Sequence, residues 1–113
     1  MVGIKVDSEL HAIIESSQKF AVNILATDQK EIAQSFFRPS QISGNAINGY
    51  TFETGKTGAP LLTDAPAHFE VEVVGAVKQG DYTVFVGEVI DATVRDENQK
   101  PLVMWDTGWF YGR

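Results

Sequence analysis

Apolar residues recur at two different spacings along this chain, and the first spacing predicts a strand followed by a helix. Val2 to Val6 is short, apolar and β-branched, which is typical of a strand. Asp7 or Ser8 can then cap a helix, because a short side-chain oxygen accepts a free N–H of the first turn. The residues expected on the buried face of this helix share a helical spacing and are Leu10, Ile13, Ile14 and Ser17. Those expected on its polar face are Glu9, His11 and Glu15.

A second strand is predicted from Lys19 to Leu25, where nearly every residue is apolar and burial on both faces is expected. Together with the preceding strand and helix, this segment has the order of a βαβ unit. If the two strands share a sheet, a right-handed crossover between parallel strands is the expected geometry.

A second helix is predicted next, because Asp28 stands three residues before Glu31 at the spacing of a capping box. Pro39 marks its end. The residues that this helix is expected to bury are Ile32, Phe36 and Phe37.

The middle of the chain, residues 40–64, is rich in Gly, Asn, Ser and Thr. It predicts a long loop, with short extended pieces from Tyr50 to Phe52 and from Pro60 to Leu62. A loop of this length is often functional.

From Ala67 the apolar spacing changes to two, which is typical of an antiparallel strand with one face in water. The apolar positions are Phe69, Val71 and Val73, and the polar ones are His68, Glu70 and Glu72. A turn at residues 79–81 then leads into a long strand from Tyr82 to Val94. Gly87, in the middle of that strand, predicts a bulge or a close approach of another backbone.

The C-terminal part predicts a turn at residues 96–98 and a last strand from Pro101 to Trp105. Its aromatic residues predict a surface docked on the barrel or on a second subunit; they are Trp105, Trp109, Phe110 and Tyr111. No internal repeat or domain boundary interrupts residues 1–113, which are therefore expected to form one domain. Early helices and a late antiparallel meander indicate a mainly β fold with helices (α+β), closed as a barrel.

Composition narrows the classes of partner. The net charge is −6, and the nine basic residues are scattered, so a nucleic-acid partner is not expected. No apolar stretch approaches the roughly 20 residues of a membrane span, and no membrane partner is expected. The absence of cysteine excludes disulfides and zinc–thiolate sites and fits a cytoplasmic location. The two histidines form no HxH or HxxxH pair, so no metal site is predicted.

Three stretches, in this order, resemble the flavin reductase-like, FMN-binding split β-barrel family. The first is SQKFAVNILATDQKEIAQSFF from Ser17, which is similar to the family's Phe-Ala-Val-Asn strand and the helix after it. The second is GAPLLTDAPAHF from Gly58, and the third is GDYTVFVGEVIDA from Gly80. Together they cover most of the chain, and their order and spacing are more specific than any one of them.

The resemblance implies a split β-barrel that binds FMN or FAD and forms a homodimer or a larger assembly. It also implies hydride transfer between NADH or NADPH and the flavin. The residues that it places beside the flavin are Phe20, Ala21, Val22 and Asn23. Those that it places near the FMN phosphate are Lys5, Asp7 and Ser8, and a helix N-terminus with its free N–H groups suits a phosphate. No catalytic residue is assigned.

Two departures from the family pattern leave alternatives open. The family's first strands have no counterpart before Met1, so the resemblance implies a barrel incomplete at its N-terminus. Tyr82 stands where the family carries a histidine near the nicotinamide or flavin. The chain is therefore a flavin oxidoreductase, a flavin-binding or electron-transfer module without turnover, or a degenerate barrel acting as an oligomeric interaction domain.

For several of these residues, a purely structural role is an alternative to flavin binding. Asn23 either contacts the flavin or satisfies a neighbouring backbone group. Ser8 is either a phosphate ligand or a plain helix cap, and Lys5 is either a phosphate contact or a solvated side chain. Tyr50 and Phe52 stack on a flavin or pack on the sheet.

Overall fold

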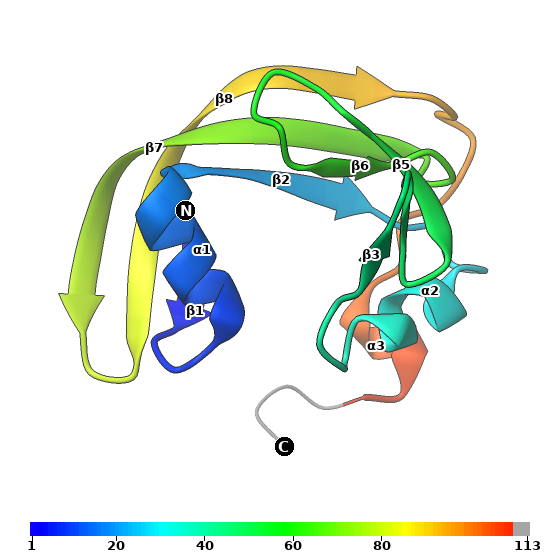
Figure 1. The fold of residues 1–113 in the computed structure, drawn as a ribbon. Helices are drawn as coiled ribbons and strands as arrows, with labels where there is room; N and C mark the ends of the chain where they lie inside the picture. Colours follow the sequence, from blue (N-terminus) through cyan, green and yellow to red (C-terminus); the bar gives the residue numbers. More distant parts are fainter. Residues whose placement is uncertain (110–113) are drawn as a thin grey trace.

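The computed structural model describes residues 1–109, and two four-stranded sheets form its frame (Figure 1). The larger sheet has the order β1-β8-β7-β2. Its strands are β1 (Val2–Lys5), β2 (Lys19–Ile24), β7 (Ala67–Gln79) and β8 (Tyr82–Val94). The smaller sheet has the order β3-β4-β5-β6, with β3 (Ile42–Ser43), β4 (Ala46–Ile47), β5 (Tyr50–Thr54) and β6 (Pro60–Leu62). The helices are α1 (Glu9–Ser17), α2 (Lys30–Ser35) and α3 (Met104–Thr107).

The long β7–β8 hairpin is the spine of the larger sheet, and it curls around α1 (Figure 1). Its turn contains Gly80 at φ +65°, so both predicted strands and the turn between them are confirmed. Gly87 lies opposite a register shift in β7, and a Cβ added to it would overlap Cγ1 of Val71. The predicted bulge and the predicted close approach are both present there.

The expected parallel βαβ unit is wrong. β1 pairs antiparallel with β8, and β2 pairs antiparallel with β7, so the β7–β8 hairpin lies between them. With an antiparallel pair in between, β1 and β2 run in opposite directions at the two edges of the sheet. β2 is also half-buried rather than buried on both faces, because it is an edge strand.

The predicted cap of α1 is confirmed, but the predicted buried face is confirmed only at Ile14. Ser8 is the N-cap residue. His11 and Ile14 are the buried residues of the helix, at 9% and 1% exposure, whereas Leu10 and Ile13 are 50% and 60% exposed. The helix is rotated so that the His11 ring meets β8, where it packs 5.5 Å from the ring of Phe85.

The predicted capping box of α2 is also wrong. Gln29 is the N-cap residue, and its side chain accepts a hydrogen bond from Ala26 N (2.9 Å) and donates one to Asp64 O (2.7 Å). Within the helix, Ile32 is buried as expected, while Phe37 after its end is largely exposed. A small core gathers here from α2, β4, β6 and the turn after it: Ile32, Ile47, Leu62 and Ala65, with Phe36, Tyr50 and Phe52 packed against it.

The predicted long loop contains the smaller sheet, and its two expected extended pieces are β5 and β6. The expected last strand is wrong: Pro101 forms a single bridge with Ala26, and α3 follows. Trp105 on α3 is 92% exposed, so it does not dock on the barrel of its own chain. Trp109 packs edge-on against Phe37 at 4.8 Å, and the expectation for Phe110 and Tyr111 lies outside the described residues.

The two edges of the larger sheet are unequal. β1 pairs with only the first residues of β8, from Tyr82 to Phe85. Within residues 1–109, the rest of β8, from Val86 to Val94, has no partner strand on the side away from β7. This part of β8 carries the acidic residues Glu88 and Asp91.

No helix in the described part of the chain is both long and apolar enough to cross a bilayer.

Candidate functional site

A tight corner between β1 and α1 brings together four of the residues predicted to contact a flavin. Ser8 Oγ donates to Lys5 O (2.8 Å) and accepts from His11 N (3.2 Å), which closes the turn. Lys5 is paired with Tyr82 across the β1–β8 ladder. Asp7 lies exposed in the turn between Lys5 and Ser8.

The corner offers hydrogen-bond donors to an anion. The first amides of a helix have no acceptor inside it, and Ser8 takes only that of His11. Glu9 and Leu10 amides remain at the helix N-terminus, where the helix dipole also favours negative charge. The exposed Lys5 side chain adds a cation, while Asp7 and Glu9 add carboxylates of the opposite sign. An anion held here therefore depends on directed N–H groups more than on net charge.

Tyr82 lies beside β1, on the face of β8 opposite to the one on which Thr83 meets α1. Its side chain is 36% exposed, and a Cβ placed on Gly3 would be 4.0 Å from Tyr82 Cδ2, so the ring lies across β1. An aromatic ring at the edge of a surface corner is suited to stack on a planar ligand.

The second predicted group, Phe20 to Asn23 on β2, lies elsewhere on the sheet. Asn23 is paired with His68, near the start of β7, whereas Tyr82 is paired with Gln79 at its end. These two β7 positions are about 36 Å apart along the strand at roughly 3.3 Å per residue. Along the sheet, the structure therefore separates the two groups.

Strand alternation also divides the second group between the two faces of the sheet. Phe20 and Val22 point to one face, and Ala21 and Asn23 point to the other. The four residues cannot all present side chains to one ligand.

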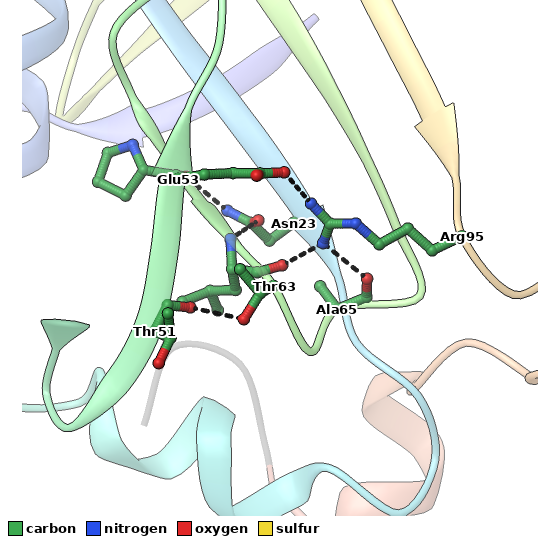
Figure 2. A network of polar contacts seen from close by, with 8 residues as sticks. Asn23, Thr51, Glu53, Thr63, Ala65 and Arg95 are labelled. Carbon is green, nitrogen blue, oxygen red and sulfur yellow. Dashed lines mark hydrogen bonds and ion pairs between the residues drawn. The ribbon is translucent and has the colours of Figure 1, made fainter. Parts of the chain in front are cut away.

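The amide of Asn23 is engaged by the smaller sheet (Figure 2). Its Nδ2 donates to Pro60 O (3.1 Å), and its Oδ1 accepts from Leu62 N (2.9 Å). Asn23 thus fastens β2 to β6, which is the structural role left open by the sequence. One N–H and one lone pair of this amide remain for any other partner.

Arg95, directly after β8, makes a second connection between the sheets (Figure 2). Its guanidinium donates to the carbonyl oxygens of Leu62 and Ala65 and forms an ion pair with Glu53 (Nη2–Oε1 2.6 Å). The sequence around Arg95 does not predict this role, because its partners include backbone carbonyls that are distant in the sequence.

Glu70 and His68 are buried, contrary to the expectation that they face water. The β5–β6 loop covers this end of the sheet, and Glu70 is fully buried. Its carboxylate accepts hydrogen bonds from Lys56 N (3.2 Å), Thr57 N (2.9 Å) and Thr57 Oγ1 (2.7 Å). The loop fits closely, since a Cβ on Gly55 would be 2.5 Å from Glu70 Oε2.

The pKa of Glu70 is lowered below its ordinary value. Burial on its own would raise the pKa, but the hydrogen bonds from Thr57 and Lys56 outweigh it, and His68 adds a smaller favourable charge interaction. Glu70 is therefore ionised in the folded chain near neutral pH. His68 lies buried beside it, and its Nδ1 has no hydrogen-bond partner.

His11 is a further residue that the sequence pattern predicts to be exposed to solvent but that is buried in the structure. Its Nε2 is 2.8 Å from Thr83 Oγ1, and Thr83 is fully buried on β8. One signal was available: His11 stands three residues before Ile14 and therefore shares its helical face.

The described residues offer suitable groups for a flavin phosphate at one place. The β1–α1 corner has free amides, Lys5 and the ring of Tyr82. On β2, by contrast, the side chains are divided between faces and the Asn23 amide is largely used. Lys5 and the first turn of α1 are the groups that would hold the phosphate.

Comparison with known proteins gives a consistent set of relatives. Residues 1–112 match the family model described as "Flavin reductase like domain". The ferric-chelate reductase (NAD(P)H) of Archaeoglobus fulgidus is 36% identical over 91 residues, which are 78% of this chain and 53% of that protein. The NADH-dependent FAD reductase of Streptomyces globisporus is 34% identical over 89 residues, 77% of this chain and 49% of that protein.

Solved structures agree with the fold. The NADH:FAD oxidoreductase SgcE6 of Streptomyces globisporus C-1027 superposes with a TM-score of 0.78 at 28% identity, over 88% of this chain and 60% of that one. Flavin reductase PheA2 superposes with a TM-score of 0.70 at 34% identity, over 88% of this chain and 61% of that one. The predicted mainly β split-barrel fold is confirmed. The chain spans about half the length of the curated relatives it matches.

Proposed function

Because this chain belongs to the flavin reductase-like domain family, we propose that it is the flavin-binding part of an NAD(P)H-dependent flavin oxidoreductase. The cofactor is FMN or FAD, and the co-substrate is NADH or NADPH. The observation that carries the proposal is the β1–α1 corner, where Ser8 caps α1 and its Oγ donates to the carbonyl oxygen of Lys5, the strand partner of Tyr82. Relatives named as NADH-dependent FMN and FAD reductases support this choice of reaction.

When bound, the flavin supplies the hydride-accepting chemistry, and the chain supplies binding and orientation. The amides of Glu9 and Leu10 would donate to the phosphate, and Lys5 would neutralise part of its charge. Tyr82, paired with Lys5, would limit where the ring system lies. Ser8 caps the helix and so keeps the amides in place, because its hydroxyl proton is already donated to Lys5 O.

The direct test is a titration of the 113-residue chain with FMN, followed by flavin absorbance and fluorescence. We expect saturable binding with a perturbed flavin band. Lys5→Gln should weaken binding about fivefold, because one exposed charge contact contributes about 1 kcal/mol. Lys100→Gln, in the loop after β8, is the matched control and should leave the affinity unchanged. Absence of any binding by the wild-type chain would contradict the proposal.

The proposal also covers the oligomeric state of the protein and its cellular compartment. A homodimer is expected, with exposed apolar groups such as Trp105 and Val89 available for contact. Light scattering after size exclusion should give twice the 12.4 kDa of the chain, and a monodisperse monomer would contradict it. A cytoplasmic location is proposed because a chain without cysteine suits a reducing compartment.

A second candidate is a flavin-binding module without turnover. Tyr82 favours it, because a tyrosine is a poorer proton donor near neutral pH than the histidine that the family resemblance places there. Oxidation of NADH or NADPH that depends on added flavin supports the reductase. Flavin binding with no such oxidation supports the module.

A further inference from the structure

We infer that His11 is a positioning residue for the flavin site: it fastens the β1–α1 corner to β8 and so sets the affinity for the flavin phosphate. The inference rests on the proposed function for the identity of the ligand. His11 forms one hydrogen bond through its backbone amide and another through its imidazole ring.

The backbone and the side chain of His11 hold different parts of the corner. Its amide donates to Ser8 Oγ (3.2 Å), which completes the cap of α1. Its ring Nε2 lies 2.8 Å from Oγ1 of Thr83, inside the sheet. A movement of this one residue would therefore disturb the helix cap and the helix–sheet contact together.

These contacts form a closed series that links β1, α1 and β8 at the candidate site. Ser8 Oγ continues the chain of hydrogen bonds to Lys5 O (2.8 Å), and Lys5 pairs with Tyr82 across the ladder. Tyr82 precedes Thr83 in the sequence, and Thr83 is the residue that the His11 side chain contacts, so the series of contacts returns to its starting point. Strand pairing already joins Lys5 to Tyr82, so His11 is what ties Ser8 and the first turn of α1 to the same strand, β8.

Another polar contact that fastens α1 to the sheet, the ion pair between Glu15 and Lys78, is exposed to solvent and therefore weak. Only His11 and Ile14 are buried among its residues, and Leu10 and Ile13 are exposed. Ile14 contributes non-directional packing, which does not fix the rotation of the helix. The hydrogen bond from His11 to a buried hydroxyl is directional, and a lost partner would leave that hydroxyl unsatisfied.

The orientation of the imidazole is set from its other side. His11 Nδ1 lies 3.4 Å from Oε2 of Glu15, and Glu15 Oε1 lies 3.3 Å from Nζ of Lys78. A carboxylate facing Nδ1 places the proton of a neutral ring on that nitrogen, which leaves Nε2 to accept from the Thr83 hydroxyl. The same contacts also accommodate the protonated ring.

The test compares four variants of the 113-residue chain. Thr83→Val and His11→Leu remove the hydrogen bond from either side, and His11→Gln keeps an amide that can reach Thr83. Ile32→Val, in the small core by α2, lowers stability without touching α1. The readouts are the Kd for FMN, from flavin fluorescence, and the hydrogen-exchange rates of the amides of α1.

We expect Thr83→Val and His11→Leu to raise the Kd about tenfold, the effect of losing one well-formed hydrogen bond. Exchange of the α1 amides should speed up in the same two variants. His11→Gln should restore the wild-type Kd to within about twofold, and Ile32→Val should leave the Kd unchanged.

The outcomes separate this inference from the proposed function. If the wild-type chain binds FMN and Thr83→Val binds it equally well, the inference is overturned while the function stands. If Ile32→Val weakens binding as much as Thr83→Val does, the effect is general stability and the inference is likewise overturned. If the wild-type chain binds no FMN, the proposed function is overturned and the affinity claim falls with it. In that case, faster exchange of the α1 amides in Thr83→Val would still support the claim that His11 fastens the β1–α1 corner to β8. Unchanged exchange would overturn that claim as well.

Discussion

Glu70 places a carboxylate in the interior, and its hydrogen bonds offset the cost of removing it from water. A buried charge without partners would cost far more than a small domain can tolerate. Among residues 1–109, its hydrogen-bond donors all belong to Lys56 and Thr57, on the loop between β5 and β6. The carboxylate is therefore also the group that holds this loop on β7.

Glu70→Gln is expected to lower the free energy of unfolding by about 2 kcal/mol, because it removes hydrogen bonds to a charged acceptor and turns an amide N–H toward the donors of Thr57. Urea denaturation at pH 7 measures this. Glu72→Gln, at an exposed position two residues further along the same strand, is the control and should change stability by less than about 0.5 kcal/mol. Equal effects at the two positions would contradict the role assigned to Glu70.

The effect of Glu70 should also depend on pH. The pKa of Glu70 is lowered in the folded chain, so its stabilisation is present above the pKa of the unfolded state, about 4.3. It is lost as the pH falls through the lower, folded-state value. The difference in stability between wild type and Glu70→Gln should therefore shrink progressively below about pH 4.3. A difference that stays constant down to pH 3 would argue against the lowered pKa.

Single-residue roles were predictable only where the partner is close in the sequence. Ser8 as a helix cap follows from residues a few positions away. The burial of Glu70 and His68 does not, because the loop that covers them is formed by residues 55–57. Strand alternation identifies which residues share a face but not which face another segment will cover.

At the scale of elements, the β7–β8 hairpin depends on a close approach at Gly87. A side chain there would overlap Val71, which is itself buried. The bulge opposite Gly87 allows the hairpin to bend sharply, and the bend is what wraps the sheet around α1 (Figure 1).

Gly87→Ala is expected to destabilise the chain by about 1–3 kcal/mol through overpacking. Gly75→Ala is a matched control on the neighbouring strand, since its Cβ would lie 3.9 Å from the Val86 side chain, an ordinary contact. Thermal unfolding of both variants and of Gly87→Ala/Val71→Ala measures the effect. The double variant should recover part of the loss, and the absence of recovery would point to a backbone effect instead.

Elements with a strong local pattern were predictable, and those set by distant contacts were not. The alternation from Phe69 onward and the turn at Gly80 identified the hairpin. The segment from Pro101 to Trp105 looks equally apolar, yet it forms an isolated bridge from Pro101 to Ala26 and the chain turns into α3. An apolar run of this length does not distinguish a strand from a short helix.

At the scale of the whole molecule, polar contacts join the two sheets. Asn23 connects β2 to β6, and Arg95 connects the end of β8 to Leu62, Ala65 and Glu53 (Figure 2). The topology itself was not predictable from the order of elements. Which strand separates β1 from β2 depends on pairing across the chain, and a strand–helix–strand sequence also fits an antiparallel sheet.

Asn23→Ala should loosen the smaller sheet without unfolding the larger one. The expected result is faster hydrogen exchange in β5 and β6, because the amide of Leu62 loses its acceptor, with little change in the centre of β7 and β8. Exchange measured by mass spectrometry resolves the two regions, and Asn98→Ala, in an exposed turn, is the control. Uniform acceleration throughout the chain would show that the sheets unfold as one unit.

The side of β8 left without a partner strand after Phe85 bears on how this protein behaves in concentrated solution. An uncovered strand can recruit a strand of another molecule, and charged side chains are a common protection against this. Glu88 and Asp91 lie on this stretch, and the net charge of the chain vanishes near pH 4.7. Aggregation should therefore be fastest near that pH, and a buffer well above it, where the chain carries a net negative charge, is the one in which the chain stays dispersed.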